Sequence, residues 1–359
     1  MSVFVSQATA THSDLPILDL TRFYDPETRP QFLQELQVLA RDIGFFYLTG
    51  HGLSHARIEE IESISQAFFA LDQTEKQRLS MDNSPHFRGY TQLYAENTRN
   101  IPDAREQIDI GPELPALPFD AATPLWHRLQ GPNQWPTDWD EFQQVTTAWL
   151  RDLRRIATDL LHAFMLALKV PENALDAFVT GTPNELLKLI HYPKTELQHQ
   201  LQQGVGAHKD TNILTLLLQD QVGGLQVQRD GKWIDVPYVE DAFVINIGET
   251  LELATNGYLV ANTHRVVSPT QQDRYSIAYF ISPNVFAGDL PVLQLPAELQ
   301  RLATGSVSDP LNPLLKSIGQ NSIKSRLRSH LSVTAKFYPA QYQEIISNPH
   351  RVVGGQYDA

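Results

Sequence analysis

The chain of 359 residues contains no cysteine and has fewer positive than negative charges. Without cysteine there can be no disulfides, zinc–thiolate sites, iron–sulfur clusters or cysteine nucleophiles, so a transition metal must be held by histidine and carboxylate. The chain has 28 Lys and Arg residues and 41 Asp and Glu residues, which gives a formal net charge of −13. A surface of that sign disfavours nucleic acid and anionic membranes as non-specific partners.

Long apolar runs are missing as well. The most apolar stretches, such as residues 160–170, are too short and too interrupted to cross a bilayer. Residues 1–13 are rich in Ser, Thr and Ala and lack the basic segment and long apolar run of a secretory signal. We therefore expect a cytoplasmic globular protein with no membrane partner and no nucleic-acid partner.

The first part of the chain predicts an α/β region with one irregular stretch. Residues 14–20 and 45–52 have the composition of short strands, and apolar residues recur at helical spacing over residues 29–43. Residues 72–136 are rich in proline and predict little regular structure. Such an excursion is either a lid over a binding site or a surface insertion.

The chain from residue 137 onward predicts a helix-braced β core. An acidic first turn and a continuous apolar stripe predict a long helix that opens at Thr137. Eight short β-type segments follow, with turn signals such as Gly223-Gly224 and Asp230-Gly231 between them. Eight short strands with tight turns are typical of a jelly roll, also called a double-stranded β-helix. The fold class is therefore mixed α/β, in the α+β sense, with N-terminal and flanking helices bracing a jelly-roll core.

These elements divide the chain into four parts of one compact unit. We predict a loose N-terminus at residues 1–13 and an N-terminal α/β region, including the irregular excursion, at residues 14–136. The helix-braced jelly-roll core follows at residues 137–340, and a C-terminal tail occupies residues 341–359.

Three residues form a candidate metal site. His208 and Asp210 are two residues apart in a β-type segment, so their side chains point to one face, and closure of a jelly roll can bring His264 beside them. Two imidazoles and one carboxylate suit iron(II) with open coordination positions, although zinc accepts the same set. An isolated His-X-Asp is a weak signal, and a surface location is the alternative. His191 is the main rival histidine, but it alternates with apolar neighbours and predicts a structural role.

Arg274 and Ser276 form a candidate site for an acid. They are also two residues apart on a predicted strand, so both face the same side. An inward guanidinium is costly unless an anion pairs with it, and a fork of donors beside a hydroxyl suits a carboxylate. An exposed or structurally paired arginine is the alternative. Tyr192 could donate a hydrogen bond to the same carboxylate, or serve as a core tyrosine.

The sequence resembles the isopenicillin N synthase-like family of non-haem iron(II), 2-oxoglutarate-dependent oxygenases. Each matching segment is short, but their combination over about residues 14–340 is specific. The matching segments are HKD at 208–210, NTHRV at 262–266, RYS at 274–276, GGLQV at 223–227, VINIGE at 244–249, PILDL at 16–20, GFFYLTGHG at 44–52 and FRGY at 87–90.

The resemblance implies a distorted jelly roll and an iron enzyme, an oxidoreductase. Its Fe(II) ligands would be His208, Asp210 and His264, and the far carboxylate of 2-oxoglutarate would meet Arg274, Ser276 and Tyr192. The implied reaction is that of a dioxygenase that uses O2, with ascorbate as a candidate reductant. It would hydroxylate, desaturate or cyclise a small-molecule substrate and release succinate and CO2.

One departure keeps alternatives open. Many plant members carry Asn-Tyr-Tyr-Pro where this chain has an apolar residue, Ile190, in the Asn position. Isopenicillin N synthase is similar to this chain here and uses no 2-oxoglutarate. The alternatives are thus a 2-oxoglutarate-independent oxidase, an ethylene-forming type, or a non-catalytic binding protein, which the intact ligand set disfavours.

The substrate pocket is predicted from position relative to these motifs, and the sequence indicates no oligomeric state. If Arg88 or Arg105 faces the iron, the substrate is a carboxylic acid; otherwise both arginines are structural. The predicted pocket residues are Arg88, Tyr90, Tyr94, Leu218, Val266 and Phe280.

Overall fold

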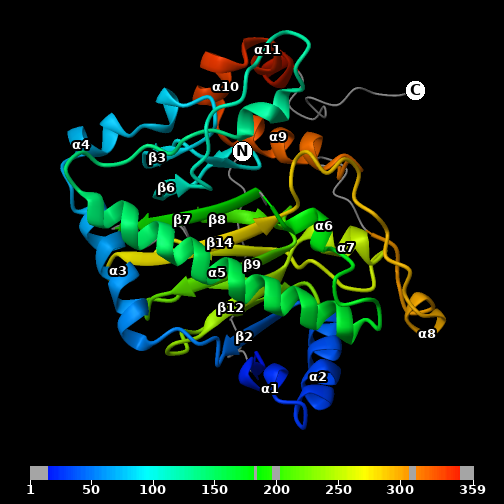
Figure 1. The fold of residues 1–359 in the computed structure, drawn as a ribbon. Coiled ribbons are helices and arrows are strands. Elements are labelled where there is room, and N and C mark those ends of the chain that lie inside the picture. Colours follow the sequence, from blue (N-terminus) through cyan, green and yellow to red (C-terminus); the bar gives the residue numbers. More distant parts are fainter. Residues whose placement is uncertain (1–14, 182–183, 196–202, 307–312, 348–359) are drawn as a thin grey trace.

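The computed structural model describes residues 15–181, 184–195, 203–306 and 313–347. Two main β-sheets form the centre of the molecule (Figure 1). The larger has eight strands in the order β1-β2-β12-β9-β14-β7-β6-β3, and the smaller has four in the order β11-β10-β13-β8. Apolar residues of both sheets pack into one cluster between them. The predicted jelly-roll core in an α+β fold is therefore confirmed.

All eight predicted core strands form. The Asp230-Gly231 turn joins two of them, and both residues have positive φ (50° and 73°), as a tight two-residue hairpin requires. The strands are β7 (Asn184–Tyr192), β8 (Gln203–His208), β9 (Leu214–Gln219), β10 (Leu225–Arg229), β11 (Lys232–Asp235), β12 (Phe243–Ile247), β13 (His264–Val267) and β14 (Arg274–Ser282).

The N-terminal region adds four strands to the larger sheet. They are β1 (Ile17–Asp19), β2 (Phe45–Thr49), β3 (Gly89–Thr91) and β6 (Glu106–Ile110). The helices of this region are α1 (Thr21–Tyr24), α2 (Arg29–Asp42), α3 (His55–Phe69) and α4 (Gln73–Arg78). Because β2 pairs with β12 and β6 pairs with β7, one sheet continues across the predicted boundary at residues 136 and 137.

The excursion at residues 72–136 is more regular than predicted. Besides α4, β3 and β6 it contains a small hairpin of β4 (Asn97–Thr98) and β5 (Ile101–Pro102), and the 3-10 helices η1 (Met81–Asn83) and η2 (Leu125–Leu129). The sequence prediction failed here because the strands are very short or depend on a distant partner. β6, for example, pairs along its whole length with β7.

The long helix α5 (Asp140–Ala167) lies across the outer face of the larger sheet (Figure 1). It begins three residues after the predicted start at Thr137. Asp138 has a positive φ of 58°, and Trp139 has φ −133° and ψ 65°, so neither residue is helical. The apolar stripe of α5 packs on the sheet, and Trp149 is fully buried there.

Strand alternation separates two cores. On β14, Ile277, Tyr279 and Ile281 join the large cluster under α5, whereas Ala278 and Phe280 face the space between the sheets. The same alternation holds on β9, β12 and β2. Side chains that face the inside of the jelly roll are therefore fixed by their parity along each strand.

The C-terminal part covers one end of the jelly roll with helices (Figure 1). The remaining helices are α6 (Asp176–Val179), α7 (Glu249–Ala254), α8 (Ala297–Gln300), α9 (Ile318–Ser329), α10 (Leu331–Phe337) and α11 (Pro339–Ser347). The predicted loose N-terminus at residues 1–13 lies outside the described residues. So does the predicted C-terminal tail from residue 348 onward, while its first residues complete α11.

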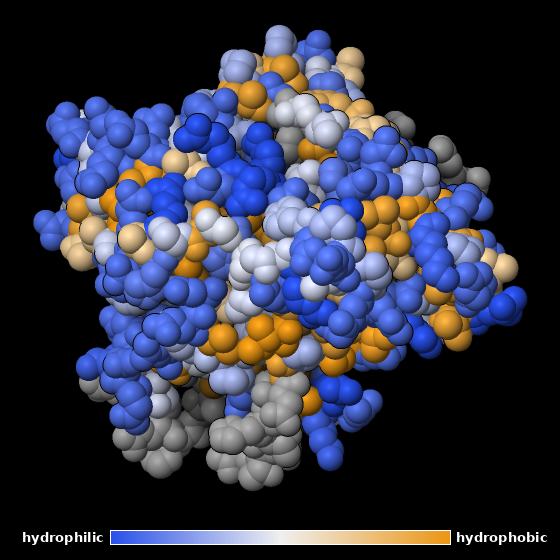
Figure 2. All heavy atoms as spheres, turned by 60° about the horizontal axis from the view of Figure 1, so that its bottom comes forward, coloured by the Kyte–Doolittle hydropathy of each residue, from blue (hydrophilic) through white to orange (hydrophobic). Residues whose placement is uncertain are grey.

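The described helices include none that combines the length and apolar character needed to cross a membrane. The face of the molecule in Figure 2 is mainly hydrophilic, with smaller hydrophobic areas between polar side chains.

Candidate functional site

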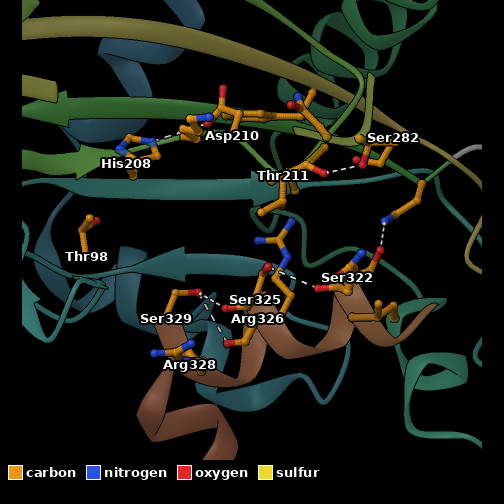
Figure 3. A pocket seen from close by; sticks show the side chains of 18 of the residues that line it. Thr98, His208, Asp210, Thr211, Ser282, Ser322, Ser325, Arg326, Arg328 and Ser329 are labelled. Atoms are coloured by element: carbon orange, nitrogen blue, oxygen red, sulfur yellow. Dashed lines mark hydrogen bonds and ion pairs between the residues drawn. The ribbon is translucent and has the colours of Figure 1, made fainter. Parts of the chain in front are cut away.

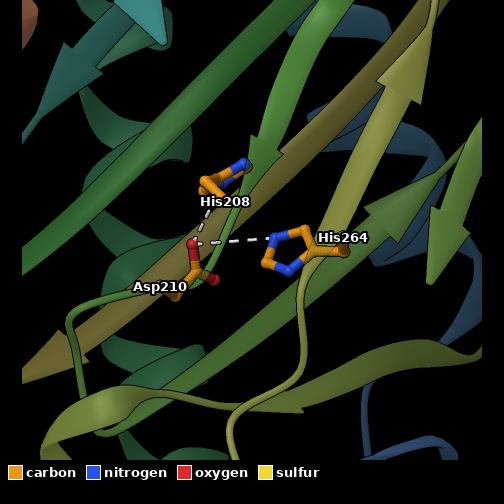
Figure 4. Close-up of side chains that lie close together, drawn as sticks. All are labelled: His208, Asp210 and His264. Carbon is orange, nitrogen blue, oxygen red and sulfur yellow. Dashed lines mark ion pairs between the residues drawn. The ribbon is translucent and has the colours of Figure 1, made fainter. Parts of the chain in front are cut away.

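The structure brings His208, Asp210 and His264 together inside the jelly roll (Figure 4). His208 ends β8, His264 begins β13, and the two residues are paired across the small sheet. One ligand atom from each of the three side chains lies within 4.8 Å of the others. Asp210 Oδ1 is 3.4 Å from Nε2 of His208 and 3.7 Å from Nε2 of His264. These three side chains form the only such cluster of potential metal ligands among the described residues.

Backbone carbonyls orient both imidazoles. Nδ1 of His208 lies 2.7 Å from the carbonyl oxygen of Gly206, and Nδ1 of His264 lies 3.2 Å from that of Asn262. A carbonyl oxygen only accepts, so each Nδ1 carries the proton and each Nε2 presents a lone pair. Hydrogen bonds of this kind fix the tautomer of metal-binding histidines.

Two polar residues orient the carboxylate of Asp210. Its Oδ2 accepts hydrogen bonds from Thr215 Oγ1 at 2.5 Å and from Asn246 Nδ2 at 2.8 Å. Oδ1 is thereby left to face the histidines. Thr215 and Asn246 are cross-strand neighbours on β9 and β12. Sequence reasoning missed both, although Asn246 is the one polar residue of an otherwise apolar strand and Thr215 lies in a largely apolar one.

The electrostatics of the cluster favour ligation. Burial opposes the charged form of Asp210, but the two facing imidazoles and the hydrogen bonds from His208 and Thr215 outweigh it and hold the pKa of the carboxyl well below its usual range. Burial is the main cause that lowers the pKa of His264 to about 4, so this imidazole is neutral at neutral pH. Burial also opposes the charged form of His208, but the hydrogen bond and charge of Asp210 outweigh it and raise the pKa of this imidazole. A neutral imidazole and an ionised carboxylate are the forms that bind metal.

The predicted acid-binding residues also meet inside the jelly roll. Arg274 is fully buried, donates from Nη1 to Ser276 Oγ at 3.2 Å, and lies over the ring of Tyr192 with its Cζ 4.8 Å from the centroid. Its Nη2 donates a long hydrogen bond of 3.4 Å to Gln219 Oε1, which sequence reasoning missed. The ring of Tyr192 meets the guanidinium of Arg274, and Tyr192 also interacts electrostatically with Arg105.

Within the described residues the guanidinium of Arg274 forms no ion pair, and Asp220, which it affects electrostatically, is bonded to the backbone N–H of Tyr275. The Nε of Arg274 lacks a hydrogen-bond partner, and no carboxylate of the described residues lies within ion-pair distance. A buried cation without an anion is costly, so this position fits the carboxylate of a bound acid. The residues present therefore fit an iron(II) ion and a dicarboxylic co-substrate.

A cavity of about 430 Å³ opens beside the metal cluster. Figure 3 shows His208 and Asp210 on one side of it and Ser325, Arg326 and Ser329 of α9 on the other. This volume is typical of sites for small molecules. The α9 side chains were not predicted from the sequence, because the polar surface of a helix gives no signal of what it faces.

The structure places only two of the six predicted pocket residues, Arg88 and Phe280, in the lining of this cavity. Tyr90 and Leu218 instead point to the core under α5, since their strand neighbours take the inward positions. Val266 packs in the cluster between the sheets, and Tyr94 is 47% exposed outside the lining.

The rival histidine, His191, lies away from the metal cluster. Its Nδ1 is 2.7 Å from Glu106 Oε1, and its ring stacks on Tyr275 with centroids 4.7 Å apart. The predicted structural role agrees with these contacts. Ile190, on the neighbouring position, lies in the apolar cluster between the sheets and is paired with Ser276.

Comparisons with known proteins agree with this geometry. Residues 15–138 match a family model described as "non-haem dioxygenase in morphine synthesis N-terminal". Residues 183–283 match the model of the 2OG-Fe(II) oxygenase superfamily. The second match contains the candidate metal and co-substrate residues.

Relatives and solved structures extend the similarity to most of the chain. A 2-oxoglutarate-dependent dioxygenase, frbJ, of Dothideomycetidae sp. is 33% identical over 93% of this chain and 94% of its own length. A homoarginine-6-hydroxylase of Arabidopsis thaliana is 31% identical over 75% of this chain and 85% of its own length. The structure of a full-length Neurospora crassa protein in complex with alpha-KG (2-oxoglutarate) has a TM-score of 0.71 and 25% identity, and covers 90% of this chain and 98% of that one.

The chain thus belongs to the non-haem 2-oxoglutarate and iron(II) oxygenases, as the sequence motifs predicted. It is an oxidoreductase, a dioxygenase that uses Fe(II), 2-oxoglutarate and O2.

Proposed function

We propose that the protein couples the oxidative decarboxylation of 2-oxoglutarate to the hydroxylation, desaturation or cyclisation of a small molecule, with release of succinate and CO2. The observation that supports this most directly is the pairing of two sites inside one jelly roll. One is a His-Asp-His cluster bordering a cavity, and the other is a buried guanidinium that forms no ion pair within the described residues.

Each residue has a proposed task. His208, Asp210 and His264 hold the iron, with Thr215 and Asn246 orienting the carboxylate. Arg274 and Ser276 bind the far carboxylate of 2-oxoglutarate, and the ring of Tyr192 supports the guanidinium. The bound iron and co-substrate supply the activation of O2.

The protein itself contributes position and exclusion of water. The apolar cluster between the sheets includes Tyr192, which lies against Arg274, and Phe45, which packs edge-on against the ring of His264 with centroids 5.4 Å apart. The cavity then holds the substrate beside His208 and Asp210. Cytoplasmic location and use of ascorbate remain predictions from the sequence.

An anaerobic titration tests the proposal. The protein is loaded with Fe(II) and then titrated with 2-oxoglutarate while binding is followed by absorbance and calorimetry. We expect 2-oxoglutarate to bind with one equivalent per iron, and O2 then to yield succinate. Iron binding without 2-oxoglutarate binding would contradict the proposal and favour the oxidase alternative, and ethylene in the headspace would identify the ethylene-forming type.

A further inference from the structure

Two arginines of the described chain are buried, Arg88 (4% exposed) and Arg274 (0%). Neither guanidinium lies within ion-pair distance of a carboxylate in the described residues, and the Nε of each lacks a hydrogen-bond partner. A buried guanidinium in this condition is stabilised by a bound anion. The co-substrate accounts for Arg274 under the proposed function, and Arg88 is left without an anion.

The contacts of Arg88 with the protein are weak. Its guanidinium donates to the carbonyl oxygens of His86, Phe87 and Leu129 at 3.3, 3.4 and 3.4 Å, which are long for hydrogen bonds. Burial lowers the pKa of Arg88 to about 10, so the side chain is still a cation at neutral pH. The guanidinium therefore makes three long hydrogen bonds to carbonyl oxygens, and its Nε is left without a partner.

A second arginine on the cavity wall shows the contrast. The guanidinium of Arg105 is nearly as buried, but Glu96 lies 2.8 Å from its Nη2 and Asp103 lies 3.4 Å from the same atom. Glu96 also pairs with Lys188 at 3.1 Å. These cations of the wall have counter-ions within the protein.

Two carboxylates, Asp109 and Glu113, act on Arg88 electrostatically, and both are engaged with other groups. Glu113 accepts hydrogen bonds from Asn133 and Trp135. Asp109 lies 3.0 Å from Arg326 Nη1 and 3.5 Å from Lys188 Nζ. Asp109 therefore forms ion pairs with two other cations. Its effect on Arg88 is a longer-range electrostatic one that raises the pKa of the arginine.

The guanidinium of Arg88 is also held in place. It lies against the backbone of Gly111, where an added Cβ would come within 2.4 Å of its Nε and Nη2. A fixed guanidinium fork is suited to bidentate recognition of a carboxylate. Arg88 lines the same cavity as His208 and Asp210, so an acid bound to it would place its carbon skeleton in the space beside the metal cluster.

We propose that the substrate of this enzyme is a small organic acid whose carboxylate binds Arg88. The inference rests on the proposed function, because it takes the cavity beside the metal cluster as the substrate site. The rest of the lining agrees with it, since basic residues outnumber acidic ones there, although Arg105, Lys188, Lys209 and Arg326 are paired with carboxylates of the protein. The cationic residues of the lining are Arg88, Arg99, Arg105, Lys188, Lys209, Lys316, Arg326 and Arg328, and the acidic ones are Glu96 and Asp210.

Matched pairs of acids and amides test this on the unmodified protein. The probes are phenylacetate, benzoate, hexanoate and cyclohexanecarboxylate, each with its primary amide. They are titrated calorimetrically into protein saturated with Fe(II) and 2-oxoglutarate without O2. We expect acids of the panel to bind about ten- to a hundredfold more tightly than their amides. Equal binding in every pair, or no binding by any acid, would overturn the inference.

Two variants locate the preference. Arg88→Gln should bind acid and amide alike and still bind 2-oxoglutarate normally. Lys232→Gln is the matched control, because Lys232 is an exposed cation outside the cavity lining and its loss should keep the preference. An acid preference that survives in Arg88→Gln contradicts the role of Arg88.

A third variant covers the case in which Arg88→Gln does not fold. Gly111→Ala keeps the arginine but displaces its guanidinium, and it should weaken acid binding while leaving amide binding unchanged. Failure of the unmodified protein to bind 2-oxoglutarate would count against the proposed function. Normal 2-oxoglutarate binding with equal acid and amide affinities would count against the substrate class alone.

Discussion

The two walls of the cavity are built in different ways. The metal wall comes from neighbouring strands, with His208 and His264 paired directly across β8 and β13. The opposite wall combines α9 with Arg88 and the β4–β5 hairpin, which lie far from α9 in the sequence and share no strand register with it. Strand pairing fixes the metal wall through hydrogen bonds and alternation, whereas the opposite wall depends on how distant elements dock.

Removal of a metal ligand should have the largest effect on iron binding and activity. Asp210→Ala removes the carboxylate ligand, and we expect loss of Fe(II) binding and no detectable succinate formation. Anaerobic Fe(II) titration and succinate assays measure both. Asp159→Ala is the control and should leave iron binding unchanged. Asp159 lies on α5, and its side chain accepts hydrogen bonds from Tyr24 and Arg155 rather than from the metal cluster. Tight iron binding by the Asp210 variant would exclude this residue as a ligand.

The next largest effect should be on the binding of 2-oxoglutarate. Arg274→Gln removes the charge that would meet the far carboxylate of 2-oxoglutarate, so the KM for 2-oxoglutarate should rise about ten- to a hundredfold. Iron affinity should stay close to that of the unmodified protein. Arg88→Gln is the partner control, because it should leave the KM for 2-oxoglutarate unchanged. An unchanged KM in the Arg274 variant would place the co-substrate elsewhere.

A smaller effect on iron affinity should follow when one metal ligand loses a hydrogen bond that orients it. Thr215→Val keeps the shape of the side chain and removes the hydrogen bond to Asp210 Oδ2. Loss of such an orienting contact should weaken iron binding about ten- to a hundredfold. Thr146→Val, also buried but bonded to the carbonyl of Phe142 on α5, should leave iron affinity unaltered. Equal iron affinities for the two variants would refute an orienting role for Thr215.

The smallest effect on function is expected at Ile190, the position where this chain departs from many plant relatives. Its side chain is buried in the apolar cluster, so Ile190→Ala should lower the free energy of unfolding by about 2–5 kcal/mol. The KM for 2-oxoglutarate should change little. Urea unfolding and steady-state kinetics measure the two quantities. A large rise in this KM with unaltered stability would mean that the side chain contacts the co-substrate.

The predictable part of the fold depends on local pattern. Alternation along β14 correctly put Arg274 and Ser276 on one side, and Asp230-Gly231 correctly marked a hairpin. The start of α5 was misplaced because acidic residues at 138 and 140 give the same helix signal, although Asp138 adopts a left-handed conformation. Local preferences identify an element well but locate its ends poorly.

The pocket was predicted less well, for a physical reason. Leu218 follows an inward-facing residue on β9, so alternation turns its side chain to the other core. Tyr90 is on β3, and its direction is set by pairing with Ile108 of β6. Pairing partners that come from distant segments are not encoded in the spacing of nearby residues.

By itself, the sequence determined the family, the jelly roll and the two short motifs proposed to bind metal and acid. Those features depend on residues two apart on a strand, and two-residue periodicity is a property of the extended backbone. Only the tertiary structure decided that Arg88 is buried without a counter-ion, and that α9 faces the metal cluster across a cavity. Burial and the sharing of counter-ions depend on all neighbours in space, so they arise only when distant segments pack together.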